Sequence, residues 1–152
     1  MTYIGVDPGQ SGAMAVIEEG IAFVIPFDER GYIDTLLTCD PKQTIACIEH
    51  VHSMPGQGVA SVFKFGANFG WIQGVFAALN IPYELVHPQK WKKEFSATSD
   101  KNTSIDVCKR LFPAVSLKKT ERCKKDNDGF AEALLLAEYA RRKFGRDEPC
   151  CF

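Results

Sequence analysis

The sequence predicts an α/β protein in which a five-stranded mixed sheet is covered by helices on both faces. Three short β-rich runs, separated by turn residues, occupy the first 27 positions and are typical of an antiparallel meander. After a fourth such run the apolar spacing becomes helical, and a fifth run precedes two further helical segments. A mixed sheet between two helical layers is the simplest way to bury segments in this order.

The three N-terminal runs are Tyr3–Val6, Ala13–Ile17 and Ile21–Phe27. Asp7 ends the first run and is followed by Pro8 and Gly9, all residues that favour turns. One interpretation is that Asp7 simply starts the turn. The other is that the tight reversal leaves its carboxylate facing a cleft. Both interpretations predict a hairpin, but only the second predicts a functional site at Asp7.

The next segments complete the first half of the chain. Residues 28–40 are polar and allow a helix, and Thr44–Val51 is a fourth, β-branched strand that contains Glu49. The stretch "HSMPGQGVAS" is predicted to be a loop, because Pro55, Gly56 and Gly58 interrupt it.

A long helix is predicted over Val59–Leu79, where apolar residues recur every three or four positions. Gly66, Gly70 and Gly74 form one narrow stripe along it, and each costs about 1 kcal/mol relative to alanine inside a helix. Something is therefore expected to pack closely there, either the sheet of the same chain or a second subunit. Polar residues such as Lys64 on the same helix argue against association inside a membrane.

The second half continues with a strand over Ile81–His87 and a loop or short helix in "PQKWKKEF". An amphipathic helix is predicted over Asp100–Phe112, a basic loop over 116–125 and a last helix over Asp128–Phe144. We expect one domain over residues 1–146 and a C-terminal tail over 147–152.

Composition narrows the class of protein. The 152 residues suit one domain, and neither a signal segment nor a membrane-spanning window is present, so we expect a protein that is cytoplasmic or nucleoid-associated. The six cysteines form no C-x-x-C pair, which argues against a zinc site. Net charge is −1, yet residues 86–125 carry eleven Lys/Arg against four Asp/Glu, a net +7. A basic segment between acidic ones fits either a phosphate-binding surface or an unpartnered solvated one.

Four acids stand out as candidate metal ligands and catalytic residues: Asp7, Glu49, Asp128 and Glu132. If the first and fourth strands are neighbours, Asp7 and Glu49 meet at one end of the sheet. Asp128 and Glu132 lie about 40° apart on the last helix, above a stripe that turns apolar at Leu135. The alternative is that acids here only cap the helix, which we favour for Asp126 and Asn127. Clustered carboxylates need cations, and oxygen ligands suit Mg²⁺, with Mn²⁺ as a substitute. A pair of such ions is what phosphodiester hydrolysis uses.

Four separated motifs resemble the RuvC family of Holliday junction resolvases, which has a ribonuclease H-like fold. The motifs are "IGVDPGQSGAMAV", "CIEHVHSMPGQGVASVFKFGANFGWIQG", "HPQKWKK" and "DNDGFAEALLLA". The "MPGQG" loop is similar to the phage and chloroplast branch. The best-known bacterial members carry two aspartates three apart on the last helix, whereas here the acids are four apart and the second is Glu. Either Asp126 or Asp128 could then be the ligand, and the helix geometry favours Asp128.

The resemblance implies a homodimer that nicks opposite strands of four-way junction DNA symmetrically, with two metal ions per active site. Asp7 and Glu49 match the strand ligands, and Asp128 and Glu132 match the helical acids. The loop after Glu49 is expected to enter the junction, and the glycine stripe to lie on the dimer helix. The candidate DNA-binding residues are Met54, Gly56, Gln57, Gly58, Lys90, Lys92, Lys93, Lys118, Lys119, Lys124 and Lys125. Trp91 is expected in the core rather than stacked on DNA.

Two other functions fit the same residues. A nuclease of the same fold acting on RNA–DNA hybrids or other branched DNA would keep the four acids without needing a dimer. A non-catalytic junction-binding protein would bind DNA without metal. A sugar-kinase or actin-like phosphate-binding protein would need two such domains around a nucleotide, and the chain has length for one.

Overall fold

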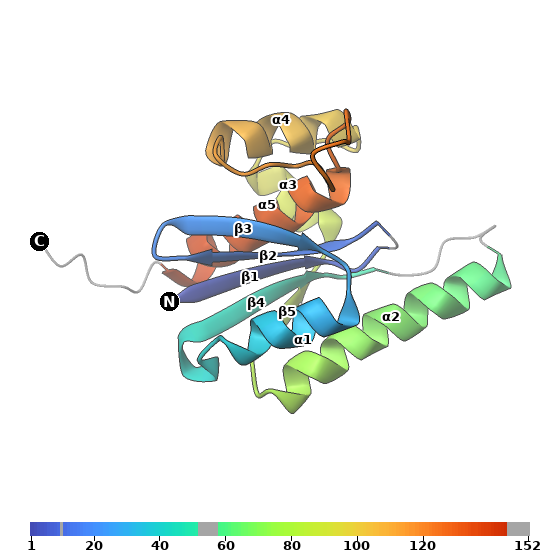
Figure 1. Ribbon diagram of the computed structural model, residues 1–152, viewed down its shortest axis with the longest axis vertical. Coiled ribbons are helices and arrows are strands. Elements are labelled where there is room, and N and C mark those ends of the chain that lie inside the picture. The colour runs from blue at the N-terminus through green and yellow to red at the C-terminus, as the bar shows by residue number, and fades with distance from the viewer. Residues whose placement is uncertain (10, 52–57, 146–152) are drawn as a thin grey trace, which may run out of the picture.

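A five-stranded mixed sheet forms the centre of the computed structural model, which describes residues 1–9, 11–51 and 58–145 (Figure 1). The strands are β1 (Thr2–Asp7), β2 (Ala13–Glu18), β3 (Ile21–Pro26), β4 (Thr44–Glu49) and β5 (Tyr83–Val86), in the spatial order β3-β2-β1-β4-β5. The first three strands pair antiparallel, whereas β4 pairs parallel with both β1 and β5. The predicted meander and mixed sheet are thereby confirmed.

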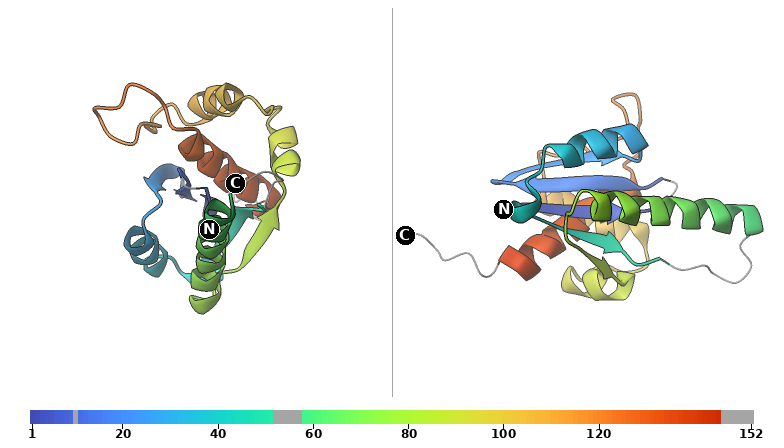
Figure 2. Two further views of the ribbon diagram at one scale, coloured as in Figure 1. Left: turned by 90° about the vertical axis from the view of Figure 1, so that its right-hand side faces the viewer. Right: turned by 90° about the horizontal axis from the view of Figure 1, so that it is seen from below.

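Helices cover both faces of this sheet, as predicted (Figures 1 and 2). They are α1 (Glu29–Leu37), α2 (Val59–Ala78), α3 (Pro88–Glu94), α4 (Lys101–Leu111) and α5 (Asp128–Phe144), with a short 3₁₀ turn at Pro41–Gln43. One face packs with α1 and α2, and the other packs with α5, behind which lie α3 and α4. The segment "PQKWKKEF" is therefore a short helix, and the polar stretch after β3 is helical.

Successive side chains of β1 point to opposite faces of the sheet, and this alternation decides on which face Asp7 lies. Ile4 and Val6 belong to the core beneath α1 and α2, whereas Tyr3 packs on the α5 side. Gly5 lies on that side too, and a Cβ there would come within 2.1 Å of the Ala133 carbonyl oxygen of α5. Since only glycine permits this approach, α5 lies directly on β1.

The helix α5 is more deeply buried than its predicted single stripe indicates. Every residue from 129 to 140 is buried except Glu132, because the sheet covers one side of the helix and α4 the other. Its N-terminus reaches the end of the sheet at which β1 and β4 finish. Glu132 is thus the one incompletely buried position of this central segment.

The glycine stripe of α2 does not pack on the sheet, so that interpretation is wrong. In the part of the chain that the structure describes, a Cβ at Gly66, Gly70 or Gly74 would meet nothing within 4 Å. The helix packs through Ile72 and Phe76, and its N-terminal half extends past the sheet (Figure 1). The second-subunit interpretation of the stripe stays a prediction.

Other differences from the sequence-based prediction are small. The strand expected over residues 81–87 spans only Tyr83–Val86, because β4, its partner, ends at Glu49. Among residues 1–9, 11–51 and 58–145, no helix has the length and apolarity needed to cross a bilayer. The expected C-terminal tail lies outside the described residues.

Candidate metal centre

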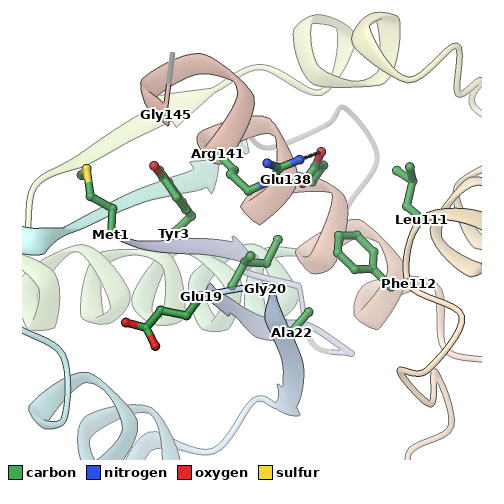
Figure 3. A pocket seen from close by; sticks show the side chains of 11 residues that line it. Met1, Tyr3, Glu19, Gly20, Ala22, Leu111, Phe112, Glu138, Arg141 and Gly145 are labelled. Atoms are coloured by element: carbon green, nitrogen blue, oxygen red, sulfur yellow. Dashed lines mark hydrogen bonds and ion pairs between the residues drawn. The ribbon is translucent and has the colours of Figure 1, made fainter. Parts of the chain in front are cut away.

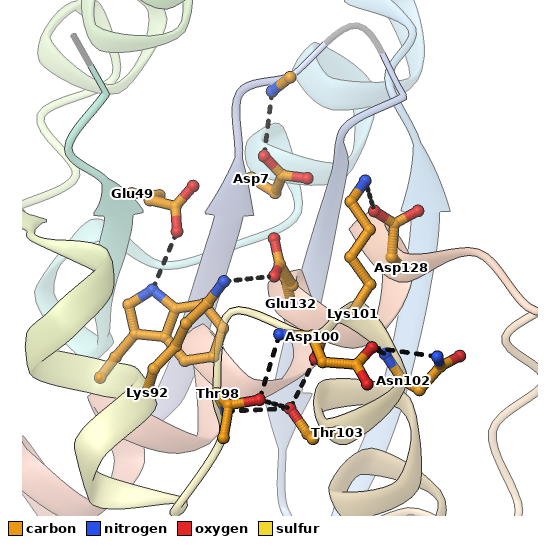
Figure 4. A network of polar contacts seen from close by, with 12 residues as sticks. Asp7, Glu49, Lys92, Thr98, Asp100, Lys101, Asn102, Thr103, Asp128 and Glu132 are labelled. Atoms are coloured by element: carbon orange, nitrogen blue, oxygen red, sulfur yellow. Dashed lines mark hydrogen bonds and ion pairs between the residues drawn. The ribbon is translucent and has the colours of Figure 1, made fainter.

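Three carboxylates converge at the end of the sheet where β1 and β4 finish. Asp7, Glu49 and Glu132 each offer one oxygen, and these oxygens all lie within 4.8 Å of one another. In the parallel register Val6 is opposite Ile48, so the acid that follows each of them lies at the same edge. The first turns of α5 place Glu132 over this edge (Figure 4). The predicted meeting of the strand acids is observed.

The electrostatics of this cluster favour a cation. Burial, together with the charges of Glu132 and Asp128, raises the pKa of Asp7 from 3.8 to about 6. Burial, together with the charges of Asp7 and Glu132, raises the pKa of Glu49 from 4.5 to about 7. Both shifts mean that the ionised forms of Asp7 and Glu49 are unfavourable, because nearby positive charge does not offset burial and the neighbouring carboxylates. The all-oxygen donor set fits a hard divalent cation such as Mg²⁺ or Mn²⁺.

The turn after Asp7 holds its carboxylate in place. The Gly9 backbone N–H donates to Asp7 Oδ1 over 3.0 Å, and the Gly12 N–H donates to the Gly9 carbonyl oxygen over 2.8 Å. Gly129, in the first turn of α5, lies against this turn: a Cβ there would be 2.4 Å from the Ser11 carbonyl oxygen and 3.0 Å from Asp7 Oδ2. Asp7 therefore both begins a turn and faces the cluster.

Asp128 lies beside the cluster but outside the group of three. Its carboxylate pairs with the Lys101 ammonium of α4 (Figure 4). Burial acts to raise the pKa of Asp128, but the hydrogen bond and charge of Lys101 outweigh it and lower that pKa. Asp126 pairs with a different lysine, because its Oδ2 lies 2.6 Å from Lys109 Nζ. Asn127 caps α5 by accepting the Phe130 N–H over 3.1 Å, as predicted.

Trp91 and Lys92, two consecutive residues of α3, each contact a different carboxylate of the cluster. The Trp91 side chain is 0% exposed, which confirms its expected place in the core, and its Nε1–H donates to Glu49 Oε1 over 3.0 Å. Lys92 Nζ lies 2.8 Å from Glu132 Oε1. Lys92, expected to contact phosphate, is thus paired with an acid of the cluster.

The remaining candidate DNA-binding residues are spread more widely. Lys90 Nζ lies 3.8 Å from Glu84 Oε1. Gly58 is the exposed N-cap of α2. Exposed lysines with no role inside the core are Lys93, Lys118, Lys119, Lys124 and Lys125. The candidates Met54, Gly56 and Gln57 lie outside the described residues.

Three contributions to the centre are not recognisable from the sequence alone. Lys101 is one of eleven cations in a basic segment, and nothing in its spacing singles it out. Gly129 is not recognisable as a contact of the β1–β2 turn until the chain is folded. The sequence predicts the place of Trp91 in the core, but the hydrogen bond of its indole depends on β4 and α3 being neighbours. The adjacency of Asp128 and Gly129 in "DNDGF" is the only local sign of a crowded helix start.

A cavity of about 520 Å³ lies at the other end of the sheet (Figure 3). It is lined by Tyr3 at the start of β1 and by Arg141 near the end of α5, among other residues. Arg141 donates to both oxygens of the buried Glu138 over 2.7 and 2.8 Å, so this buried acid is neutralised. The end of the sheet at which Asp7, Glu49 and Glu132 converge, rather than this cavity, is the candidate site.

Comparisons with known proteins agree with this architecture. No protein-family model matches the chain, and no curated protein matches it. Among solved structures, Thermus thermophilus RuvC in complex with a Holliday junction substrate matches with a TM-score of 0.64 and 12% identity, over 95% of this chain and 97% of that one. A further Thermus thermophilus RuvC structure matches with a TM-score of 0.56 and 15% identity, over the same shares of the two chains. The chain therefore has the ribonuclease H-like fold of the RuvC resolvase structures.

Proposed function

We propose that the protein is a metal-dependent endonuclease that resolves four-way DNA junctions by paired, symmetric nicks. The observation that carries this proposal is the convergence of Asp7, Glu49 and Glu132 at the end of β1 and β4 in a RuvC-like fold. Burial and the neighbouring carboxylates raise the pKa of Asp7 and of Glu49, and acids held in this way are costly to a fold and typical of functional sites. The similar Thermus thermophilus structure was determined with a Holliday junction substrate, which supports the choice of DNA.

Each acid has a defined place in the proposed mechanism. Asp7, Glu49 and Glu132 would hold the metal, and Asp128 would complete the set at its edge. Mg²⁺ is the expected ion, with Mn²⁺ as its substitute and two ions per site. When bound, Mg²⁺ would supply an activated water and charge stabilisation for the leaving oxygen. Asp7 and Glu49 are fixed by the sheet, so their oxygens need little rearrangement on binding.

Cationic side chains surround the acids on the α3 and α4 side. Lys92 pairs with Glu132, and Lys101 pairs with Asp128. Both ammonium groups lie at the margin of the cluster, where a phosphate of the substrate would also lie. The exposed lysines between α4 and α5 extend this positive surface and give affinity without sequence selectivity.

Symmetric nicking requires two active sites, and we propose that α2 provides the contact between two copies. Its glycine stripe is open, and Val59 and Phe63 at its outer end are 87% and 76% exposed. Such a junction-resolving dimer would act where DNA recombination and repair take place, in the cytoplasm or at the nucleoid.

The test is cleavage of a labelled, mobile four-way junction with Mg²⁺, beside plain duplex and an RNA–DNA hybrid. We expect paired nicks in opposing strands of the junction alone, lost in Asp7→Asn, with junction binding retained. Asp34→Asn is the matched control, because this exposed acid pairs with Arg30 in α1. Cleavage of the hybrid instead would show a ribonuclease of the same fold. Binding without any cleavage would show a junction-binding protein.

A further inference from the structure

The side chain of Trp91 is placed to act on the metal centre from inside the core. Its indole is 0% exposed, and its Nε1–H donates to Oε1 of Glu49, a carboxylate that is itself only 8% exposed (Figure 4). We infer that Trp91 is a positioning residue that holds Glu49 in its metal-binding orientation. This inference rests on the proposed function, because it requires the three acids to bind a cation.

The two oxygens of Glu49 have different surroundings. Oε1 accepts the indole N–H over 3.0 Å, and the other carboxylate oxygen points to the side on which Asp7 lies (Figure 4). A carboxylate on a strand end has several rotatable bonds, and a hydrogen bond from a rigid, fully packed ring removes that freedom. The donor is neutral, so it fixes the carboxylate without competing with a cation for its charge.

The indole also connects Glu49 to the second acid of the centre. Lys92 Nζ lies 5.1 Å from the centroid of the Trp91 ring and 2.8 Å from Glu132 Oε1. The edge of the ring therefore contacts one ligand, and its face supports the cation that neutralises another. A buried tryptophan needs some acceptor for its N–H, and core packing alone would be satisfied by a carbonyl. Here the acceptor is a carboxylate of the cluster.

The experiment measures Mg²⁺ binding by calorimetry in wild type, Trp91→Phe and Trp71→Phe. Trp71 is the matched control, because it is the same residue type on the opposite face of the sheet, beside Phe27 and Tyr32. Loss of an outer-shell partner typically weakens metal binding by about 10- to 100-fold, and we expect a loss of that size for Trp91→Phe and none for Trp71→Phe. Mg²⁺ affinity equal to wild type in a folded Trp91→Phe protein would overturn the inference.

A second variant separates the hydrogen bond from the packing of the ring. In the Trp71→Phe background, Trp91 is replaced biosynthetically by β-(3-benzothienyl)alanine, which keeps the shape of the indole but has sulfur in place of N–H. We expect this isostere to reproduce the loss of affinity, and full affinity would assign Trp91 to packing only. In Trp71→Phe protein labelled with ¹⁵N, the single indole N–H resonance should shift on addition of Mg²⁺, and an unchanged resonance would also count against the inference.

The failure of this inference is distinguishable from failure of the proposed function. Glu49→Gln removes the ligand itself, and it is measured in the same titration. If Glu49→Gln loses Mg²⁺ binding while Trp91→Phe binds Mg²⁺ as wild type does, the metal centre is supported and the positioning role of Trp91 is wrong. If Glu49→Gln binds Mg²⁺ as wild type does, the metal centre itself is wrong, and the role of Trp91 falls with it.

Discussion

Glu49→Gln should stabilise the metal-free protein, since the carboxylate is held at a cost to the fold. Burial, with the charges of Asp7 and Glu132, raises its pKa from 4.5 to about 7. A difference of about two and a half pKa units corresponds to about 3.5 kcal/mol of unfolding free energy at pH 8, at about 1.4 kcal/mol per unit. The glutamine keeps an oxygen for the Trp91 N–H and removes the charge. For a chain of this size the unfolding midpoint should rise by about 7–14 °C.

The assay is thermal unfolding in EDTA, followed by circular dichroism across pH. Below pH 4.5 Glu49 is protonated in both folded and unfolded wild type, so the two proteins should differ little. As pH rises from 4.5 to about 7, the folded state alone retains the proton, and wild type loses stability relative to Glu49→Gln. Above about pH 7 the difference in stability between Glu49→Gln and wild type should be constant. A midpoint of Glu49→Gln at or below that of wild type at pH 8 would refute the reasoning.

Three further outcomes follow from the same structure. Mg²⁺ at 100 times its dissociation constant should stabilise wild type by about 2.7 kcal/mol and leave Asp7→Asn unchanged in thermal unfolding, and equal stabilisation of both would remove Asp7 from the site. In urea unfolding, Gly70→Ala should stabilise the monomer by about 1 kcal/mol because its Cβ meets open space, whereas Gly129→Ala should destabilise it through a backbone oxygen 2.4 Å away. The double variant Lys118→Gln, Lys119→Gln should reduce the slope of log K against log salt for junction binding by about 1.8, and an unchanged slope would place both lysines away from the DNA.

Local patterns in the sequence were sufficient for the elements and for the acids. The alternation and turn residues before position 27 predict the β-meander, and the helical spacing from Val59 predicts α2, because both depend on neighbours close in the chain. The placement of Asp7 and Glu49 at strand ends followed from period-two alternation, given that β1 and β4 pair. Those features therefore needed no tertiary information beyond the strand order.

Helix α2 shows where local patterns stop being informative. Its glycine stripe predicts a close contact of either kind. Only the folded structure shows that, among residues 1–9, 11–51 and 58–145, nothing lies within 4 Å of a Cβ added at Gly66, Gly70 or Gly74. Periodicity reports which residues share a face, but it does not report how far a helix extends past the sheet it packs on.

The sequence by itself determined the α/β class, the acids at the strand ends and the basic segment, because these follow from residue type and spacing within single elements. Tertiary structure alone decided which groups act together. It brought Glu132 rather than Asp128 into the group of three, paired Lys101 with Asp128 and set the Trp91 indole against Glu49. Such contacts join residues tens of positions apart, and their distances depend on how α3, α4 and α5 pack on the sheet, which no local pattern encodes.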